Sequence, residues 1–252
     1  MALLVVSNLT KNFDGITAVS KVSFSVAQSE IFAIIGPNGA GKTTTFNLVS
    51  GVLAPDCGEI FFRGERISGL KPHEIALRGM VRTFQTISLF DTMTVLDNVK
   101  VGCHGQARTH IFSAAFRTRA FFEEEVRMTR TALETLRLLG LERRAHEMVG
   151  NLPFGQQRLV DIARALAGEP VLLLLDEPAA GMNARERSEL MAIIRTLKQR
   201  GMTIVLIEHD MDLIMEIAER IIVLDHGEKI AEGKPEEIQR NPDVIAAYLG
   251  EA

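Results

Sequence analysis

One short stretch constrains the fold more than any other part of the chain. GPNGAGKT at 36–43 fits the pattern G-x-x-x-x-G-K-[ST] and directly follows the apolar run IFAII at 31–35. A continuously apolar run of this length is typical of a strand buried on both faces of a sheet. A buried strand, a glycine-rich loop and a helix together arrange backbone N–H groups around a phosphate. The stretch therefore predicts an α/β fold organised around a phosphate-binding loop.

The residue types in this loop fit a phosphate chain with an attached divalent metal. The glycines let the backbone fold tightly, Lys42 supplies a point charge for the β- and γ-phosphates, and Thr43 offers its hydroxyl to Mg²⁺. A glycine-rich turn without a ligand is the alternative, and the flanking strand and helix argue against it. The residues that we expect to bind a nucleoside triphosphate are Gly36, Pro37, Asn38, Gly39, Ala40, Gly41, Lys42, Thr43 and Thr44.

Two adjacent carboxylates end a second apolar run, VLLLLDE at 171–177. Ligands of open α/β sheets sit at the carboxyl ends of the strands, where Asp176 can hold the hydrated Mg²⁺ opposite Thr43. Glu177 can orient and deprotonate a water molecule aimed at the γ-phosphate. Adjacent carboxylates also serve as helix caps or turn residues, but the preceding phosphate loop favours the metal-binding and catalytic roles.

Hydrophobic periodicity predicts the rest of the architecture. Val22, Phe24 and Val26 alternate with serines, as in a half-buried strand, and VRTFQ at 81–85 is predicted as a short strand that ends at Gln85. Buried strands that alternate with amphipathic helices indicate a mostly parallel sheet covered on both faces. We predict an α/β fold, a P-loop NTPase of the RecA-like kind, with a mostly parallel sheet, an antiparallel β subdomain and an inserted α-helical subdomain.

The predicted insertion lies between about residues 87 and 165, where strand signals disappear and helical periods take over. We therefore predict a single domain over 1–252. Its nucleotide-binding α/β core, including the β subdomain, takes 1–86 and 166–252, and its helical subdomain takes 87–165.

Charge and apolar runs argue against several classes of protein. The formal net charge is −4 at pH 7, whereas a nucleic-acid-binding domain usually carries a basic excess. No apolar run approaches the roughly 20 residues of a membrane span, and the amino terminus lacks the basic start of a signal peptide. Cys57 and Cys103 have no metal-binding spacing, which indicates free thiols in a reducing compartment. We expect no nucleic-acid partner and a cytoplasmic chain that can still dock on a membrane protein.

The remaining motifs resemble those of the ATP-binding-cassette (ABC) ATPases, and the Asn-Lys-x-Asp segment with which a GTPase reads its base is absent. In that family an aromatic residue stacks on adenine, a Q-loop glutamine reaches the metal or the attacking water, and a switch histidine contacts the γ-phosphate. The matching residues here are Phe13 in LTKNFDG, Gln85 in VRTFQ and His209 in LIEHD. The alternatives are a core phenylalanine, a surface glutamine and a histidine in the core or at a cap.

The resemblance implies that the nucleotide is ATP and that the reaction is its hydrolysis. It assigns a catalytic role to Glu177, His209 and Gln85, adds Phe13 and Asp176 to the residues that bind Mg-ATP, and places Thr43, Gln85 and Asp176 at the Mg²⁺, partly through water.

LPFGQ at 152–156 resembles the family signature Leu-Ser-Gly-Gly-Gln, which in one subunit covers the ATP held by the other subunit. The segment consists of Leu152, Pro153, Phe154, Gly155 and Gln156. Gly155 and Gln156 are retained, but Pro153 replaces the serine and can neither donate a hydrogen bond nor cap the helix. A hydrogen bond to a charged group contributes about 1.5–3 kcal/mol, so we expect the ATP site completed by this signature to be weakened.

Within that family the chain is most similar to the ATP-binding subunits of high-affinity branched-chain amino acid importers. The similar segments are VRTFQTISLFDTMTVLDNV, LDEPAAGMN (with Asn183 where most family members have aspartate), LIEHDMDLIM, NPDVIAAYLGEA and the enlarged helical block around 103–125. The resemblance implies a head-to-tail pair of ATPase subunits, the second of which is a paralogue or another copy. It also implies integral membrane permease subunits, indirectly a substrate-binding protein, and a peripheral position on the cytoplasmic face of the inner (plasma) membrane. The segment through Phe90 and Val95 would form the groove for the permease.

Other functions of the same core stay open at this point. They are an ATPase subunit of another ABC system, such as a urea or amide importer or a lipid exporter, a non-transport ABC ATPase, and a nucleotide-binding module that no longer hydrolyses ATP.

A run of arginines between 104 and 130 is interpreted as a solvated helix face, partly balanced by glutamates. Contact with lipid headgroups or with the membrane partner is the alternative. The arginines are Arg108, Arg117, Arg119, Arg127 and Arg130.

Overall fold

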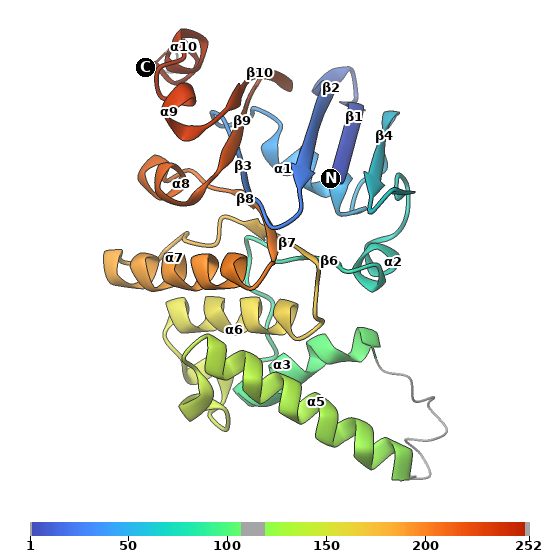
Figure 1. Cartoon of the computed structure of the whole chain (residues 1–252), viewed down its shortest axis with the longest axis vertical. Helices are drawn as coiled ribbons and strands as arrows, with labels where there is room; N and C mark the ends of the chain where they lie inside the picture. Colours follow the sequence, from blue (N-terminus) through green and yellow to red (C-terminus); the bar gives the residue numbers. More distant parts are fainter. Residues whose placement is uncertain (1, 107–118, 250–252) are drawn as a thin grey trace. The chain divides into compact units, whose positions relative to one another are not determined.

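The computed structural model describes residues 2–106 and 119–249, and the chain divides into two compact units (Figure 1). The first unit takes 1–82, 171–178 and 194–252, and the second takes 83–170 and 179–193. All strands of the described residues belong to the first unit, where they form two sheets.

The predicted apolar runs form strands of the larger sheet. Its strands, in spatial order, are β10 (Glu228–Gly233), β9 (Arg220–Asp225), β3 (Ile31–Ile35), β8 (Thr203–Ile207), β7 (Leu172–Asp176) and β6 (Met80–Arg82). All neighbouring pairs are parallel except β9 and β10, which form an antiparallel hairpin. Every residue of β3, β7 and β8 is buried, as expected for strands covered on both faces.

The smaller sheet is antiparallel and has the order β2 (Ile16–Ala27), β1 (Ala2–Phe13), β4 (Cys57–Phe62), β5 (Glu65–Arg66). Along β2, Val22, Phe24 and Val26 are buried while the serines between them are partly exposed, which confirms the predicted alternation. These side chains join the parallel sheet in one core, where the rings of Phe24 and Phe32 stack with centroids 5.4 Å apart.

The helices of the first unit connect and cover these strands. They are α1 (Lys42–Val49), α2 (Pro72–Leu77), α8 (Met211–Ile217), α9 (Pro235–Ile238) and α10 (Pro242–Leu249). α1 directly follows the phosphate loop, and its buried Phe46, Leu48 and Val49 belong to the same core as the strands.

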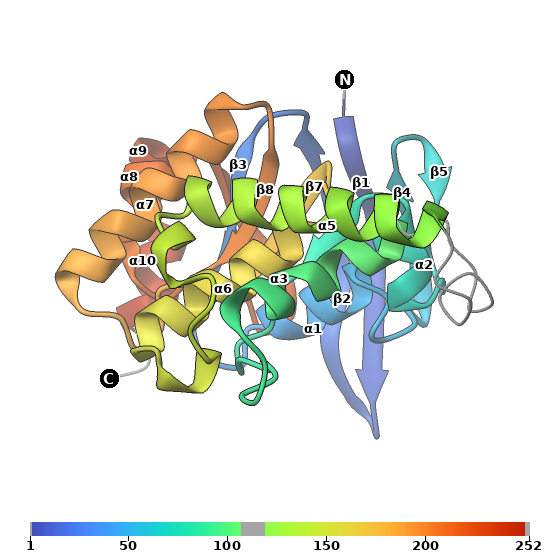
Figure 2. The same cartoon turned by 90° about the horizontal axis from the view of Figure 1, so that it is seen from below.

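The second unit is helical in the described residues. Its helices are α3 (Val95–Cys103), α5 (Arg119–Leu138) and α6 (Phe154–Leu166), with short 3₁₀ turns at His104–Gln106, Glu142–Arg144 and Val149–Asn151. Helix α3 packs against both α5 and α6 (Figure 2). On α5, Met128, Ala132 and Leu136 recur every fourth residue and are all buried, which is the pattern of an amphipathic helix. Helix α7 (Ala184–Gln199) begins in this unit and ends in the first.

The predicted α/β class, with a mostly parallel sheet, an antiparallel β part and a helical part, is confirmed. The prediction that the strand at 81–85 ends at Gln85 is wrong, because β6 ends at Arg82. The carbonyls of Phe84 and Gln85 accept hydrogen bonds from the guanidinium of Arg158 and not from a neighbouring strand. No helix within 2–106 or 119–249 has the length and apolarity that a membrane crossing requires.

Candidate active site

Glycines fix the shape of the phosphate loop between β3 and α1. Gly36 and Gly41 have φ values of 148° and 93°, in the region that favours glycine. A Cβ at Gly36 would overlap the backbone oxygen of Leu224, and a Cβ at Gly41 would overlap that of Ala18. Gly36 and Gly41 are therefore required both by backbone conformation and by close packing.

The beginning of α1 is open to an anion. Its N-cap Gly41 makes no side-chain capping bond, and the first turn contains no acidic residue. The first N–H groups of such a helix and its positive dipole end favour a negatively charged ligand. The buried Lys42 lies back over the loop, where its Nζ donates to the carbonyls of Gly36 (2.6 Å) and Pro37 (2.7 Å). The ammonium group is thus held at the loop before any phosphate arrives.

A pocket of about 220 Å³ opens over this loop in the first unit. The lining residues are Ala18, Asn38, Gly39, Ala40, Gly41, Lys42, Thr43, Thr44, Glu177 and His209. The structure therefore brings most of the predicted phosphate-binding residues together with Glu177 and His209, which come from the ends of β7 and β8. A nucleoside triphosphate placed with its phosphates on the loop would present its γ-phosphate to these two side chains.

Glu177 and His209 contact each other at the rim of this pocket. The distance from His209 Nε2 to Glu177 Oε1 is 2.6 Å, and the side chains are 45% and 14% exposed respectively. An ionised carboxylate only accepts hydrogen bonds, so in this contact Nε2 carries the proton. Because His209 is this exposed, it is not a core histidine.

The backbone of Glu177 is strained. Its φ is 46°, the left-handed region that a residue with a long side chain rarely adopts, and its N–H donates to the carbonyl of Ile207 at 3.0 Å. Such a conformation costs roughly 1–3 kcal/mol and clusters at functional sites. The turn therefore holds this carboxylate at the strand end at an energetic cost to the fold.

Asp176 is buried at the last position of β7. Its Oδ2 accepts a hydrogen bond of 2.6 Å from Nη2 of Arg82, the last residue of β6. Its carboxylate and the hydroxyl of Thr43 are hard oxygen donors of the kind that Mg²⁺ binds in small number alongside phosphate oxygens and water. The donor set in this unit therefore fits a Mg²⁺ ion that arrives with a nucleotide. In 2–106 and 119–249, no cluster of three His, Cys, Asp or Glu side chains could hold a metal ion by itself.

Phe13 lies at the end of β1 and is 42% exposed, so it is not a core phenylalanine. The ammonium of Lys11 lies 5.6 Å from its ring centroid. An exposed ring at a strand end is available for stacking on a base.

Gln85 and the signature segment belong to the second unit. Pro153 is the N-cap of α6, with φ −54° and ψ 149°, and makes no side-chain capping bond. The helix begins normally at Phe154, as expected for a proline at a helix start. The first turn of α6 contains no acidic residue, so this helix end also offers N–H groups and a positive dipole end to an anion.

Two neighbours fill the space around the signature. A Cβ at Gly155 would lie 2.5 Å from Oε1 of Glu186, so a larger residue here would require the Glu186 side chain to move. The ring of Phe154, half exposed, packs over Gly181 in the loop that follows Glu177 along the chain. Glu186 and Asn183 form a capping box, because each side chain accepts from the backbone N–H of the other at 3.0 Å.

Two arginines of α6 hold the segment that carries Gln85. The side chain of Arg158 is buried and donates to the carbonyls of Phe84 (2.8 Å) and Gln85 (2.7 Å), and Arg164 donates to that of Ser88 (2.6 Å). Asp161 lies on the same helix, and its burial raises the pKa of its carboxyl against the opposing effect of Arg164 and Arg158. No role was predicted for these arginines or for Arg82, since no local sequence pattern marks an arginine as buried.

The predicted arginine face is solvated where the structure describes it. Arg119 pairs with Glu123 at 2.8 Å and Arg127 with Glu124 at 3.0 Å, at spacings of four and three residues along α5. Arg108 and Arg117 lie outside the described residues.

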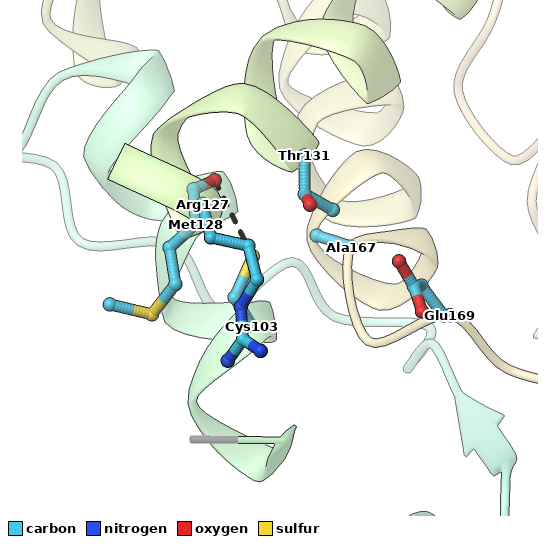
Figure 3. Close-up of a pocket in the computed structure, with 6 residues that line it drawn as sticks. All are labelled: Cys103, Arg127, Met128, Thr131, Ala167 and Glu169. Atoms are coloured by element: carbon cyan, nitrogen blue, oxygen red, sulfur yellow. Dashed lines mark hydrogen bonds between the residues drawn. The ribbon is translucent and has the colours of Figure 1, made fainter. Parts of the chain in front are cut away.

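A second pocket, of about 160 Å³, lies within the second unit (Figure 3). Its lining consists of Cys103, Arg127, Met128, Thr131, Ala167 and Glu169. The Sγ of Cys103 lies 3.8 Å from the carbonyl oxygen of Met128, and burial raises the pKa of this thiol. No residue of the predicted site lines this pocket.

Comparison with known proteins gives one consistent answer. Residues 19–180 match the family described as "ABC transporter", and residues 228–252 match the family "Branched-chain amino acid ATP-binding cassette transporter". The chain is 44% identical over 251 residues to the "High-affinity branched-chain amino acid transport ATP-binding protein BraF" of Pseudomonas aeruginosa, covering 99% of this chain and 98% of that protein.

Two solved structures are similar over nearly the whole chain. One is the ADP conformation of an ATP-binding cassette of an ABC transporter, with a TM-score of 0.87 and 32% identity over 99% of both chains. The other is a dimeric post-hydrolysis state of an ATP-binding cassette bound to ADP and Pi, with a TM-score of 0.78, 28% identity, and coverage of 92% of this chain and 98% of the other.

Proposed function

The chain belongs to the ABC transporter family, and on this premise we propose that it is the ATP-hydrolysing subunit of an importer for branched-chain amino acids. The observation that carries the ATPase part is the pocket in which the phosphate loop faces Glu177 and His209. The amino acid part rests on the 44% identical relative and on the match of residues 228–252. Residues 1–86 and 166–252 would form the nucleotide-binding core, and 87–165 the helical subdomain.

In this proposal the phosphate loop binds the triphosphate of ATP. The N–H groups at the start of α1 bind the phosphate oxygens, and the ammonium of Lys42 moves from its loop carbonyls to the β- and γ-phosphates. The exposed ring of Phe13 stacks on the adenine.

The oxygens of Thr43, Asp176 and Gln85 would hold Mg²⁺, partly through water. When bound, this ion neutralises negative charge on the β- and γ-phosphates. The hard-oxygen character of the donors supports this assignment.

The chemistry is the attack of water on the γ-phosphorus. Glu177 orients the water and accepts its proton while the bond from the water oxygen to the γ-phosphorus forms. The bond between the γ-phosphorus and the oxygen that bridges to the β-phosphate breaks, which yields ADP and inorganic phosphate. In the structure, Nε2 of His209 donates to the carboxylate of Glu177 at 2.6 Å. With ATP bound, the same N–H would donate to the γ-phosphate instead, because a neutral imidazole has one N–H donor.

A pair of ATPase subunits would complete each site, because the signature segment of one subunit would cover the ATP of the other. The dimeric neighbour with ADP and Pi supports this arrangement. The N-cap Pro153 leaves the start of α6 without a hydroxyl, so the site completed by this chain's signature is the weaker one.

Permease subunits would bind the second unit near the segment between β6 and α3. Phe84 and Phe90 in this segment are 50% and 51% exposed, so both rings are available to a partner. Val95, which we expected in the same groove, is buried in α3 and contributes to the core instead. The chain would therefore act from the cytoplasmic face of the inner membrane as a peripheral subunit, with a substrate-binding protein as an indirect partner.

The ATPase part is tested by measuring hydrolysis of Mg-ATP against protein concentration, with Glu177→Gln as the control. A specific rate that rises with concentration and is lost in the control supports paired sites. ATP binding without hydrolysis would mean that a paralogous partner is required. A specific rate that stays constant at the lowest concentrations, without self-association, contradicts the paired arrangement.

The transport part is tested by uptake of radiolabelled leucine, urea and a lipid analogue in cells with and without the chain. Loss of leucine uptake alone, restored by the intact chain and not by Glu177→Gln, supports the amino acid assignment. Unchanged leucine uptake with loss of another substrate would contradict it.

A further inference from the structure

Arg82 connects two parts of the first unit that the proposed metal site requires. Its Nη2 donates to Oδ2 of Asp176 at 2.6 Å, and its Nη1 donates to Oδ1 of Asn47 at 2.7 Å and to Oγ of Ser50 at 2.9 Å. Asp176 ends β7, Asn47 lies in α1, and Ser50 is the C-cap of α1. One guanidinium group therefore bridges the strand end and the helix that follows the phosphate loop.

This ion pair is almost fully removed from solvent. The side chains of Arg82 and Asp176 are 6% and 4% exposed, and the guanidinium also lies 5.4 Å from the ring centroid of Phe46. A buried carboxylate without a cation is strongly disfavoured, and removing one partner of a buried pair leaves an uncompensated charge. The planar fork of an arginine can bind a carboxylate and two further acceptors at once, which the compact ammonium of a lysine cannot do in the same geometry.

The bridge acts on the residues that would hold the metal. Thr43 lies in the first turn of α1, and Asn47 follows it by one turn on the same helix. Arg82 holds both α1 and the carboxylate of Asp176. It therefore fixes the position of Asp176, one proposed metal ligand, relative to α1, which carries Thr43, the other proposed ligand. Hydrogen-bonding partners of this kind orient metal ligands, and their loss typically reduces metal affinity by roughly 10- to 100-fold.

We propose that Arg82 is a positioning residue of the Mg²⁺ site, which orients Asp176 and keeps the site assembled before the ion arrives. This inference rests on the proposed function, because it assumes that Asp176 and Thr43 serve a metal bound with ATP. The competing explanation is that Arg82 only stabilises the packing of β6, β7 and α1. The two explanations differ in what they predict for Mg²⁺-dependent and Mg²⁺-independent binding of ATP.

The experiment measures binding of a fluorescent ATP analogue in the Glu177→Gln background, where hydrolysis does not interfere. The affinity is measured first in EDTA and then as a function of Mg²⁺ concentration. For Arg82→Met we expect the affinity in EDTA to stay within about twofold of the parent, because the phosphate loop is intact. The Mg²⁺ concentration for half of the maximal gain in affinity should rise roughly tenfold.

Three further variants make the result specific. Arg66→Met removes a surface arginine whose ion pair with Glu59 is more than half exposed on both sides, and it should match the parent. Arg82→Lys keeps the charge without the fork, and it should raise the Mg²⁺ requirement at least about threefold. In a background of Asp176→Asn, which itself removes most of the gain from Mg²⁺, Arg82→Met should have no additional effect.

The outcomes separate the inference from the proposed function. An unchanged Mg²⁺ requirement in Arg82→Met, or an equal loss of affinity with and without Mg²⁺, overturns the positioning role while leaving the proposed function intact. An effect of Arg82→Met that adds fully to that of Asp176→Asn also overturns it. A parent that gains no affinity from Mg²⁺ refutes the metal-dependent function and the inference together. If thermal unfolding shows that Arg82→Met does not fold, Arg82→Lys takes its place. An unchanged Mg²⁺ requirement in Arg82→Lys, or an equal loss of affinity with and without Mg²⁺, then overturns the positioning role.

Discussion

Replacing the proline of the signature by serine should separate its effect on the fold from its effect on the ATP site. Pro153 already has the extended backbone of an N-cap, so Pro153→Ser requires no rearrangement of α6. A serine cap stabilises a helix by about 1 kcal/mol. Removing a proline costs about 0.4–1 kcal/mol, because the unfolded chain gains conformational freedom. These two terms nearly cancel, so the melting temperature should change by less than about 3 °C.

At the ATP site, no opposing term offsets the contribution of the serine hydroxyl. The serine hydroxyl would add one hydrogen bond to a charged γ-phosphate, which contributes about 1.5–3 kcal/mol. This corresponds to roughly 10- to 150-fold in the stability of the ATP-bound pair or in its rate of hydrolysis. Pro153→Ser should therefore raise concentration-dependent ATP hydrolysis at least about tenfold without a matching change in stability.

The assay follows phosphate release over a range of protein concentrations, together with the melting temperature. Pro72→Ser is the matched control, because Pro72 starts α2 at a helix position remote in sequence from the signature. Glu177→Gln added to the serine variant should abolish the gain. A chain that hydrolyses ATP at the same rate with proline and with serine at this position would refute the reasoning, because the hydroxyl would then contribute no contact.

Three further predictions follow from contacts in the two units. Gly36→Ala should lower the melting temperature and reduce ATP affinity at least about tenfold, because its Cβ would overlap a backbone oxygen of β9; unchanged binding by calorimetry would contradict this. Arg158→Met should destabilise the chain by about 2–5 kcal/mol in urea denaturation, since two carbonyls lose a buried charged donor. Cys57 should react with iodoacetamide faster than the buried Cys103 at pH 7.5, because burial raises the pKa of Cys103 and lowers its thiolate fraction; mass spectrometry of the labelled peptides gives the order, and equal rates would contradict it.

Local sequence patterns predict the parts of this molecule that local rules determine. The phosphate loop follows from glycines whose backbone conformation no other residue adopts cheaply, and β3 and β7 follow from apolar runs. The capping box of Asn183 and Glu186 is likewise a rule about residues three positions apart. These features can be predicted from the local sequence without knowledge of the rest of the fold.

Features that depend on distant residues could not be predicted. Arg82 and Asp176 are 94 positions apart, and Arg158 and Gln85 are 73 positions apart. Nothing near either arginine in the sequence indicates that it is buried, since arginine is normally a surface residue. The strand that we expected to reach Gln85 stops at Arg82 for the same reason: the acceptors beyond it bind a guanidinium supplied by a different element.

Because the backbone of Glu177 is left-handed, the fold and the proposed catalytic role favour different residues at this position. Folding alone would favour glycine at this position, since glycine adopts φ near 46° without steric cost. The catalytic role that we propose for its carboxylate would account for a glutamate at the end of β7. A duplicated copy of this chain that was relieved of ATP hydrolysis would therefore gain thermal stability by exchanging this residue. The position would be an early place for mutations to accumulate in such a lineage, and glycine or asparagine there would mark a descendant that binds nucleotide but no longer drives transport.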